Sequence, residues 1–143
     1  LVEYPGANIG IAVATEDGLR VPVVLDADRM TLRELAQESR RVIELTRGGK
    51  APNMGQGNFT ISNLGMFGIE EFSAIINPPE AAILAVGAAF ESVKVAGGAI
   101  RAAHLMTLTL SCDHRVLDGV IAAQFLGRLK EILEHPECLE GND

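Results

Sequence analysis

His114 is the residue of this sequence whose type and place are best suited to chemistry. It lies in the stretch LSCDHRVLDGVIAAQFLGRLKEIL, residues 110–133, between an apolar strand-like run and an apolar helical segment that opens at Asp118-Gly119. Imidazole can act as a base near neutral pH, and the corner between a strand and a helix exposes it on a rigid scaffold. A histidine at the end of an apolar strand can equally be a hydrogen-bonded core residue, so both interpretations stay open on these residues alone.

A second corner carries hydroxyl groups. In NFTISNLG, residues 58–65, Thr60 and Ser62 stand where a strand-like run enters a glycine turn. A hydroxyl and an imidazole suggest either a serine nucleophile with its base, or a base with a separate donor to an oxyanion. Ser62 lacks the G-x-S-x-G pattern that turns a nucleophilic serine outward. The second arrangement is therefore favoured, and it needs a thiol or hydroxyl supplied by a substrate.

Asp118 is well placed to cap the helix that follows it. A carboxylate at the N-cap accepts backbone N–H groups and complements the positive end of the helix dipole. This structural role explains the residue without any part in proton transfer.

Composition limits the classes of protein to consider. The chain has 143 residues, 48% of them hydrophobic and 22% charged, which predicts one soluble globular domain over residues 1–143. A net charge of −7, no long basic run and only 4% aromatic residues disfavour nucleic acid and anionic membranes as partners.

The only cysteines are Cys112 and Cys138, too few for a disulfide scaffold or a cysteine-based zinc cluster, so no metal is expected. There is no signal-peptide pattern and no apolar run long enough to span a membrane, and a bacterial cytoplasm or a mitochondrial matrix is the expected compartment.

The elements that must position these corners are predicted from periodicity. Thr31 and Glu34 form a capping-box pattern ahead of a helix that ends at Gly48-Gly49, and a second helix is predicted from about Gly119 to His135. The apolar stripe of that second helix is broad, so it is expected to be packed. Strands are predicted over residues 8–15, 19–26, 58–62, 80–90, 92–97 and 99–111, with a hairpin turn at Gly97-Gly98. The pattern predicts an α/β fold, a mixed sheet covered by two helices.

Three ordered blocks of this sequence resemble one family. TLSCDHRVLDG, residues 109–119, is similar to the signature of the catalytic domain of dihydrolipoamide acyltransferases, the core components of 2-oxo-acid dehydrogenase complexes. GNFTISNLGMFGIEEFSAIINPPEAAILAVGA, residues 57–88, resembles a second block, and DGLRVPVV, residues 17–24, resembles a third. The resemblance implies the two-layer sandwich fold of chloramphenicol acetyltransferase, whose motif also has a histidine, three residues and Asp-Gly.

The resemblance also implies a reaction and its residues. An acyl group would pass between a dihydrolipoyl thiol and coenzyme A, in a channel at the interface of a homotrimer, with the lipoyl group carried on a separate domain. His114 would be the general base, Ser62 would donate to the oxyanion from a neighbouring subunit, and Asp118 would fix the histidine corner. Asp113 and Arg115 would form an ion pair of the same scaffold. The residues that contact coenzyme A are not identified. The acyl group is expected to be acetyl, because the second block looks most like members from pyruvate dehydrogenase complexes.

Two departures from the family pattern lead to further expectations. The family's segment ahead of residue 8, its lipoyl domain and its subunit-binding domain have no counterpart here, so the chain is expected to be a truncated catalytic domain that is poorly active alone. The C-terminal tail HPECLEGND offers only Leu139 for docking on a neighbouring trimer, so the expected assembly is a trimer, and the tail gives little support to a larger cubic or dodecahedral core.

Two alternatives to the acyltransferase are considered. The first is a non-catalytic core paralogue that serves as a scaffold and binding protein in the same complex, and the retention of His114 and Ser62 favours the enzyme over it. The second is a free-standing enzyme like chloramphenicol acetyltransferase, which the second block resembles less.

Overall fold

The central element is a mixed five-stranded sheet. The computed structural model describes residues 2–142, with side chains through residue 139. The strands follow the order β4-β1-β5-β6-β9, in which β1, β5 and β6 are parallel and the two edge strands pair antiparallel to their neighbours. Their bounds are β1 Ile9–Ile11, β4 Val23–Val24, β5 Phe59–Asn63, β6 Ala82–Val86 and β9 Leu108–Cys112. The predicted mixed sheet is confirmed.

The first two predicted strands form the expected hairpin, but each is split in two. β2 (Val13–Thr15) pairs antiparallel with β3 (Gly18–Arg20) across a turn closed between Thr15 and Gly18. Gly18 has φ +113°, a conformation that favours glycine over residues with a side chain. β1 continues ahead of β2 in the same run, and β4 follows β3, so one predicted hairpin supplies both the sheet edge and a separate two-stranded ribbon.

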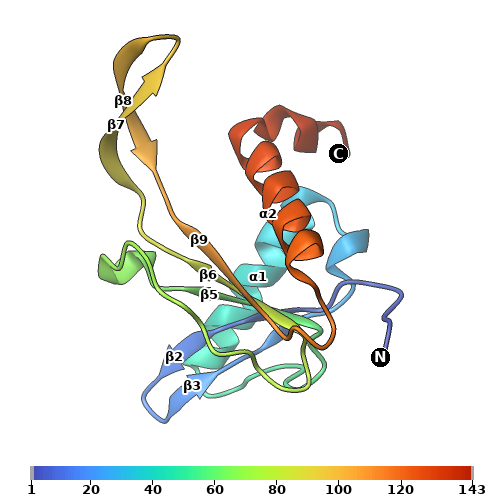
Figure 1. Cartoon of the computed structure of the whole chain (residues 1–143). Coiled ribbons are helices and arrows are strands. Elements are labelled where there is room, and N and C mark those ends of the chain that lie inside the picture. The colour runs from blue at the N-terminus through green and yellow to red at the C-terminus, as the bar shows by residue number, and fades with distance from the viewer. Residues whose placement is uncertain (1, 143) are drawn as a thin grey trace.

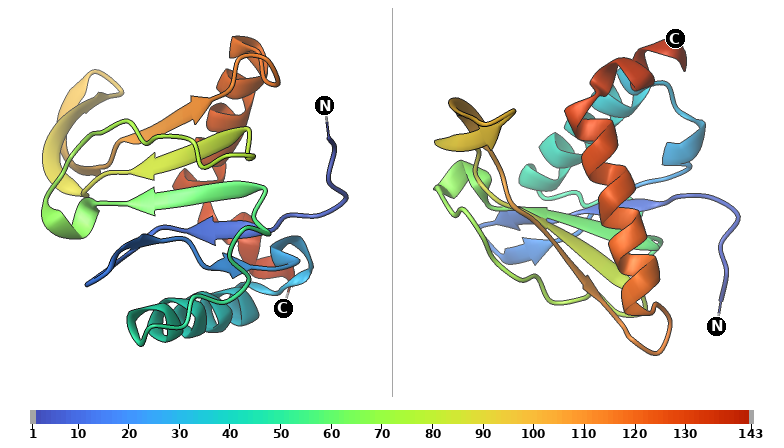
Figure 2. Two further views of the ribbon diagram at one scale, coloured as in Figure 1. Left: turned by 90° about the horizontal axis from the view of Figure 1, so that it is seen from below. Right: turned by 45° about the horizontal axis from the view of Figure 1, so that its top comes forward.

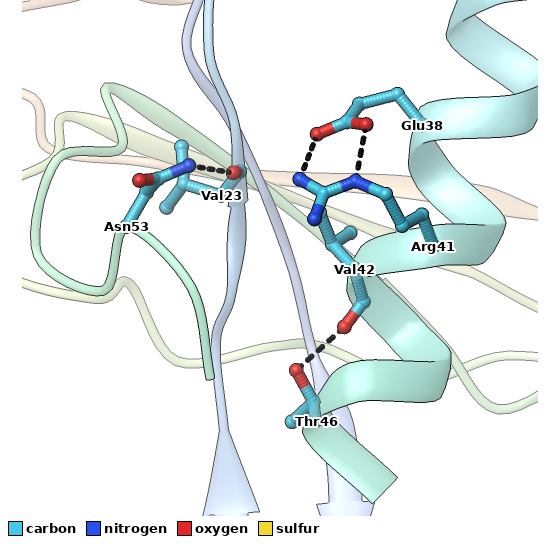
Figure 3. A network of polar contacts seen from close by, with 6 residues as sticks. All are labelled: Val23, Glu38, Arg41, Val42, Thr46 and Asn53. Carbon is cyan, nitrogen blue, oxygen red and sulfur yellow. Dashed lines mark hydrogen bonds and ion pairs between the residues drawn. The ribbon is translucent and has the colours of Figure 1, made fainter. Parts of the chain in front are cut away.

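The first helix, α1 (Leu32–Arg47), is built as its sequence predicts. The Thr31 hydroxyl accepts the backbone N–H of Glu34, and the Glu34 carboxylate accepts the backbone N–H of Thr31, so the capping box is confirmed. The helix contacts β2 and β4 and buries Val42 and Thr46 there. Figure 3 shows the Thr46 hydroxyl donating to the Val42 carbonyl at 2.7 Å, with the Glu38–Arg41 ion pair on the same helix at 2.6 Å.

The second helix, α2 (Gly119–Glu134), has the predicted length but only part of the predicted packing. It lies on the same side of the sheet as α1, and η3 (Pro136–Asn142), the turn that follows it, contacts α1 (Figures 1 and 2). None of its described side chains is fully buried, and Val120 is 66% exposed. The aromatic rings of Phe59 and Phe125, 5.7 Å apart, bridge the sheet and the helix beside a cavity of about 680 Å³. Within one chain the helix is thus packed only in part, with Ala122, Leu126, Leu129 and Ile132 half-buried.

The last predicted strand is two strands. β8 (Ala99–Leu105) pairs with β7 (Phe90–Ala96) in a ribbon that stands out from the sheet, whereas β9 pairs with β6 (Figure 1). The break at Met106-Thr107 lies where the loop after β5 crosses the end of β6. There the backbone N–H of Ala88 donates to the Ile69 carbonyl, and a Cβ on Gly87 would collide with the Glu70 carbonyl. The crossing backbone lies where both strands leave the sheet, and the two-residue turn at Gly97-Gly98 is confirmed.

The helices carry no sign of a membrane segment. In residues 2–142, none of them combines the length and the apolar character that are needed to cross a lipid bilayer.

Candidate active site

The corner after β9 is held by the charged pair that flanks His114. The backbone N–H of Asp113 donates to the Ala81 carbonyl at 2.8 Å, which fixes the corner to the residue ahead of β6. The Asp113 carboxylate accepts from the Arg115 guanidinium, with Nη2 to Oδ2 at 2.6 Å and Nε to Oδ1 at 3.0 Å, and from the Arg115 backbone N–H at 3.0 Å. The predicted ion pair is confirmed.

The same contacts set the charge state of this corner. The hydrogen bonds from the Arg115 side chain, and then from its backbone, lower the pKa of Asp113 to about 2. In return, the Asp113 carboxylate raises the pKa of Arg115. Both residues are therefore charged at neutral pH, and they form an ion pair across His114 in which the Arg115 side chain is 89% exposed.

His114 itself occupies the turn between the strand and the helix. The backbone N–H groups of Val116 and Leu117 both donate to the Asp113 carbonyl, at 2.9 and 3.0 Å, so the backbone around the histidine is tightly turned. The side chain of His114 is exposed. The core-histidine interpretation that the sequence left open is wrong, because the turn carries the imidazole away from the interior.

Asp118 closes the corner as the N-cap of α2. Its backbone is extended, and its Oδ1 accepts the backbone N–H groups of Val120 and Ile121, both at 2.9 Å. The predicted cap is confirmed. His114 thus lies between Asp113, whose carboxylate pairs with Arg115, and Asp118, which caps the start of α2.

Ser62 lies near the end of β5 and is half-buried. The turn after it is fixed by Asn63, whose side-chain oxygen accepts the backbone N–H of Gly65 at 2.8 Å, and by the backbone N–H of Leu64, which donates to the Val86 carbonyl. The serine also lines a cavity of about 350 Å³ whose other walls include Ile11, Ile61, Leu64 and Phe67. The Ser62 hydroxyl therefore lies on a mostly apolar cavity wall.

Thr60, the other hydroxyl of this strand, is not available to a substrate. It is 1% exposed, and its hydroxyl donates to the Glu80 carboxylate at 2.6 Å. Sequence reasoning missed Glu80 as a partner. The only available signal was a charged residue directly ahead of an apolar strand, in NPPEAAILAV.

Within one chain the structure does not bring Ser62 and His114 together. Ser62 pairs with Ala85 of β6, and Ala85 pairs with Thr109 of β9, so Ser62 is level with Thr109. His114 follows the opposite end of β9. At roughly 3.4 Å per residue, the step from Thr109 to Asp113 alone covers about 14 Å. A site that uses both residues must therefore combine two copies of the chain.

Metal-ligand geometry is not a feature of this region. In the part of the chain that the structure describes, no group of three or more His, Cys, Asp and Glu side chains is arranged to hold an ion.

Similarity to known proteins agrees with the motifs. Residues 1–140 match the model of the family described as 2-oxoacid dehydrogenases acyltransferase (catalytic domain). One relative is the mitochondrial dihydrolipoyllysine-residue acetyltransferase component 3 of the pyruvate dehydrogenase complex of Arabidopsis thaliana. It is 44% identical over 142 residues, which are 96% of this chain and 26% of that protein. This chain spans about a quarter to a third of the length of the curated relatives that it matches.

Two solved structures share the fold. The dihydrolipoamide acetyltransferase of Azotobacter vinelandii superposes with a TM-score of 0.91 at 38% identity, over 96% of this chain and 58% of that one. The cubic core of a pyruvate dehydrogenase multienzyme complex matches with the same TM-score and identity. The Azotobacter structure was used to investigate the roles of a serine, a histidine and an asparagine in the catalytic mechanism. Those three residues are separated in sequence by the same intervals as Ser62, His114 and Asp118 here.

The expected α/β fold is confirmed by these superpositions. The chain belongs to the 2-oxoacid dehydrogenase acyltransferase family, and residues 1–140 correspond to the catalytic domain of that family.

Proposed function

We propose that residues 1–143 form a catalytic domain that transfers an acetyl group between a dihydrolipoyl thiol and coenzyme A. One observation carries this proposal. Ser62, His114 and Asp118 occur at the intervals of the serine, histidine and asparagine studied in the mechanism of the Azotobacter enzyme. Residue types and spacing are thus retained at the two corners that the fold exposes, except that an aspartate stands in place of the asparagine.

The reaction follows from the chemistry of these groups. The His114 imidazole takes the proton of the attacking thiol, and the thiolate forms a bond to the carbonyl carbon of the acyl thioester. The resulting oxyanion accepts a hydrogen bond from the Ser62 hydroxyl. When the intermediate collapses, the bond to the departing sulfur breaks, and the imidazolium returns its proton to that thiolate. Asp118 and the Asp113–Arg115 pair contact no reacting atom and hold the histidine corner.

Coenzyme A and the dihydrolipoyl group enter this scheme as substrates, the latter carried on a separate lipoyl domain. The scheme needs no metal ion. Partners of this kind are supported by the names of the relatives, which are components of the pyruvate dehydrogenase complex. The same names support acetyl as the acyl group.

The assembly that we propose is a homotrimer in which Ser62 of one subunit faces His114 of the next. The strand register supports this arrangement, because the two residues lie far apart within each chain. A larger cubic core built from such trimers is supported by the similarity to the cubic core of the pyruvate dehydrogenase complex. The compartment that we propose is a bacterial cytoplasm or a mitochondrial matrix. The mitochondrial Arabidopsis relative supports the second of these.

The non-catalytic scaffold has no observation in its favour. A scaffold would not need an exposed histidine clamped between Asp113–Arg115 and the Asp118 cap.

The deciding experiment is an assay of acetyl transfer from acetyl-coenzyme A to dihydrolipoamide by the full-length protein. His114→Ala is expected to lower kcat by about 10²–10⁴-fold, the usual contribution of a positioned base. His135→Ala, which removes an exposed histidine at the far end of α2, is the matched control and should keep normal turnover. Near-normal turnover by His114→Ala would refute the assignment of the base.

A further inference from the structure

Glu80 is a buried carboxylate that the proposed reaction does not use. It is 9% exposed, and among residues 2–139 the other buried polar side chains are the threonines Thr46 and Thr60. A carboxylate away from water is costly unless hydrogen bonds replace its hydration. Here Oε2 accepts the Thr60 hydroxyl at 2.6 Å, and Oε1 accepts the Asn77 amide at 3.1 Å. The short contact to Thr60 is in the range of a charge-assisted hydrogen bond.

The surrounding backbone leaves little freedom to this pair. A Cβ on Gly10 would lie 2.6 Å from the Thr60 hydroxyl oxygen, and a Cβ on Gly57 would lie 2.8 Å from Glu80 Oε1. Both glycines therefore provide space that a larger residue would take from the pair.

Within one chain, this hydrogen bond links the strand that carries Ser62 to the corner that carries His114. Thr60 stands two residues ahead of Ser62 on β5, so both side chains project from the same face of the strand. Glu80 directly precedes Ala81, whose carbonyl accepts the Asp113 backbone N–H ahead of His114. A path of one side-chain hydrogen bond, one peptide unit and one backbone hydrogen bond thus connects the serine strand to the histidine corner.

We propose that the Thr60–Glu80 hydrogen bond sets the position of the His114 corner relative to β5, which makes Glu80 a positioning residue for the acyl transfer. The proposal rests on the proposed function. Glu80 contacts no reacting atom and acts through Ala81 and Asp113. Its effect is on the place of the base, because a small displacement of a catalytic group costs a large part of its rate.

The test breaks this hydrogen bond in two independent ways in the full-length protein. Thr60→Val removes the hydroxyl at constant size, and Glu80→Asp keeps the charge but shortens the side chain by one methylene. Thr60→Ser restores the hydroxyl and serves as the rescue variant. Thr46→Val is the matched control, because it also removes one buried hydroxyl, which donates to the Val42 carbonyl within α1.

Two readouts separate positioning from stability. The first is kcat and KM for acetyl-coenzyme A and dihydrolipoamide. The second is the rate at which diethyl pyrocarbonate modifies His114 as a function of pH, followed by peptide mass, with His104 and His135 as internal references. The second readout needs no turnover. A wild-type protein without transferase activity would refute the proposed function, and the modification rate would still decide whether the pair positions His114.

Thr60→Val and Glu80→Asp are each expected to lower kcat about 10- to 100-fold and to change the modification rate of His114 at least about threefold, while KM changes less than about threefold. The rates at His104 and His135 should stay unchanged, and Thr60→Ser and Thr46→Val should resemble the wild type. The proposal is overturned if Thr60→Val and Glu80→Asp behave like Thr46→Val. Should one of the two variants fail to assemble, the other decides by the same criteria. Failure of both to assemble would assign the pair to the fold alone and would also overturn it.

Discussion

Ser62 is level with Thr109 across the sheet, and His114 lies beyond the opposite end of that same strand. If each catalytic centre takes its serine from one chain and its histidine from another, two inactive variants should complement each other. Ser62→Ala and His114→Ala homo-oligomers are each expected to be nearly inactive. Co-expression of the two in equal amounts should restore about a quarter of wild-type activity, because random mixing gives that share of interfaces two intact residues.

The measurement is the acetyl-transfer rate of the co-expressed mixture, compared with the two proteins mixed after separate assembly. Only co-expression is expected to restore activity. A co-expressed mixture as inactive as its components would contradict a site shared between subunits. Light scattering that finds only monomers would contradict it as well.

Asp118 is expected to act through its cap and not through its charge. Asp118→Asn should keep stability and turnover, because asparagine caps a helix as well as aspartate, whereas Asp118→Ala should cost about 0.5–2 kcal/mol in the free energy of unfolding. Asp118→Ala should also lower kcat, because α2 starts next to the histidine turn. Urea unfolding and the transfer assay measure the two effects.

Thr31→Ala is the control for the cap prediction, because it removes the N-cap of the other helix. It should lower stability by a similar amount and leave kcat unchanged. A large loss of kcat in Asp118→Asn would show that the carboxylate charge itself is needed.

The Asp113–Arg115 pair makes stability depend on pH in the acid range. The pKa of Asp113 falls from an ordinary 3.8 to about 2 in the folded chain, so the unfolded chain binds more protons between these values. The contribution of the pair is therefore fully present above pH 3.8 and is lost as the pH falls through about 2. Arg115→Gln should destabilise the protein at pH 5, and its stability should converge on that of the wild type toward pH 2. Unfolding curves measured across this range test the prediction, and a difference that stays constant with pH would contradict it.

Gly87 is expected to tolerate no side chain, because a Cβ there would overlap the Glu70 carbonyl where the loop crosses the end of β6. Gly87→Ala should cost about 3 kcal/mol or more in the free energy of unfolding, at the upper end of overpacking effects. Gly127→Ala is the matched control, since nothing lies within 4 Å of a Cβ at that position in α2. That change should stabilise the protein by up to about 1 kcal/mol, because alanine is the better helix former. Equal thermal shifts in the two variants would contradict the crossing at Gly87.

Local patterns were sufficient to predict the parts of the fold that local contacts decide. The Thr31–Glu34 capping box, the Asp118 cap and the Gly97-Gly98 turn each depend on residues within three positions of one another. The assignment of Ser62 and His114 to one site stays a prediction, which the resemblance to a family supplied because no local pattern links residues so far apart in sequence.

The remaining features depend on contacts between distant segments. The break between β8 and β9 lies beside the backbone near Glu70, which is far away in sequence, and the apolar run 99–111 carries no sign of it. The exposure of α2 depends on what lies across the cavity beside Phe59, which the helix sequence does not encode. The contact between Glu80 and Thr60 could not be predicted for the same reason. The two residues are 20 positions apart, and the parallel pairing of β5 with β6 brings them together.

The five-stranded sheet and the β7–β8 ribbon also differ in how early they can form. The β7–β8 ribbon closes around two glycines, and hairpins of this type form within about 1–10 μs. By contrast, β1 has to meet β5, with Ile9 opposite Phe59, and β6 has to meet β9 after the ribbon has been made. Pairings between such distant segments are slow because loop closure must come first. During synthesis on the ribosome, the β7–β8 ribbon can therefore form before β9 is available. The edge of β6 that pairs with β9 stays unpaired until Cys112 has left the exit tunnel.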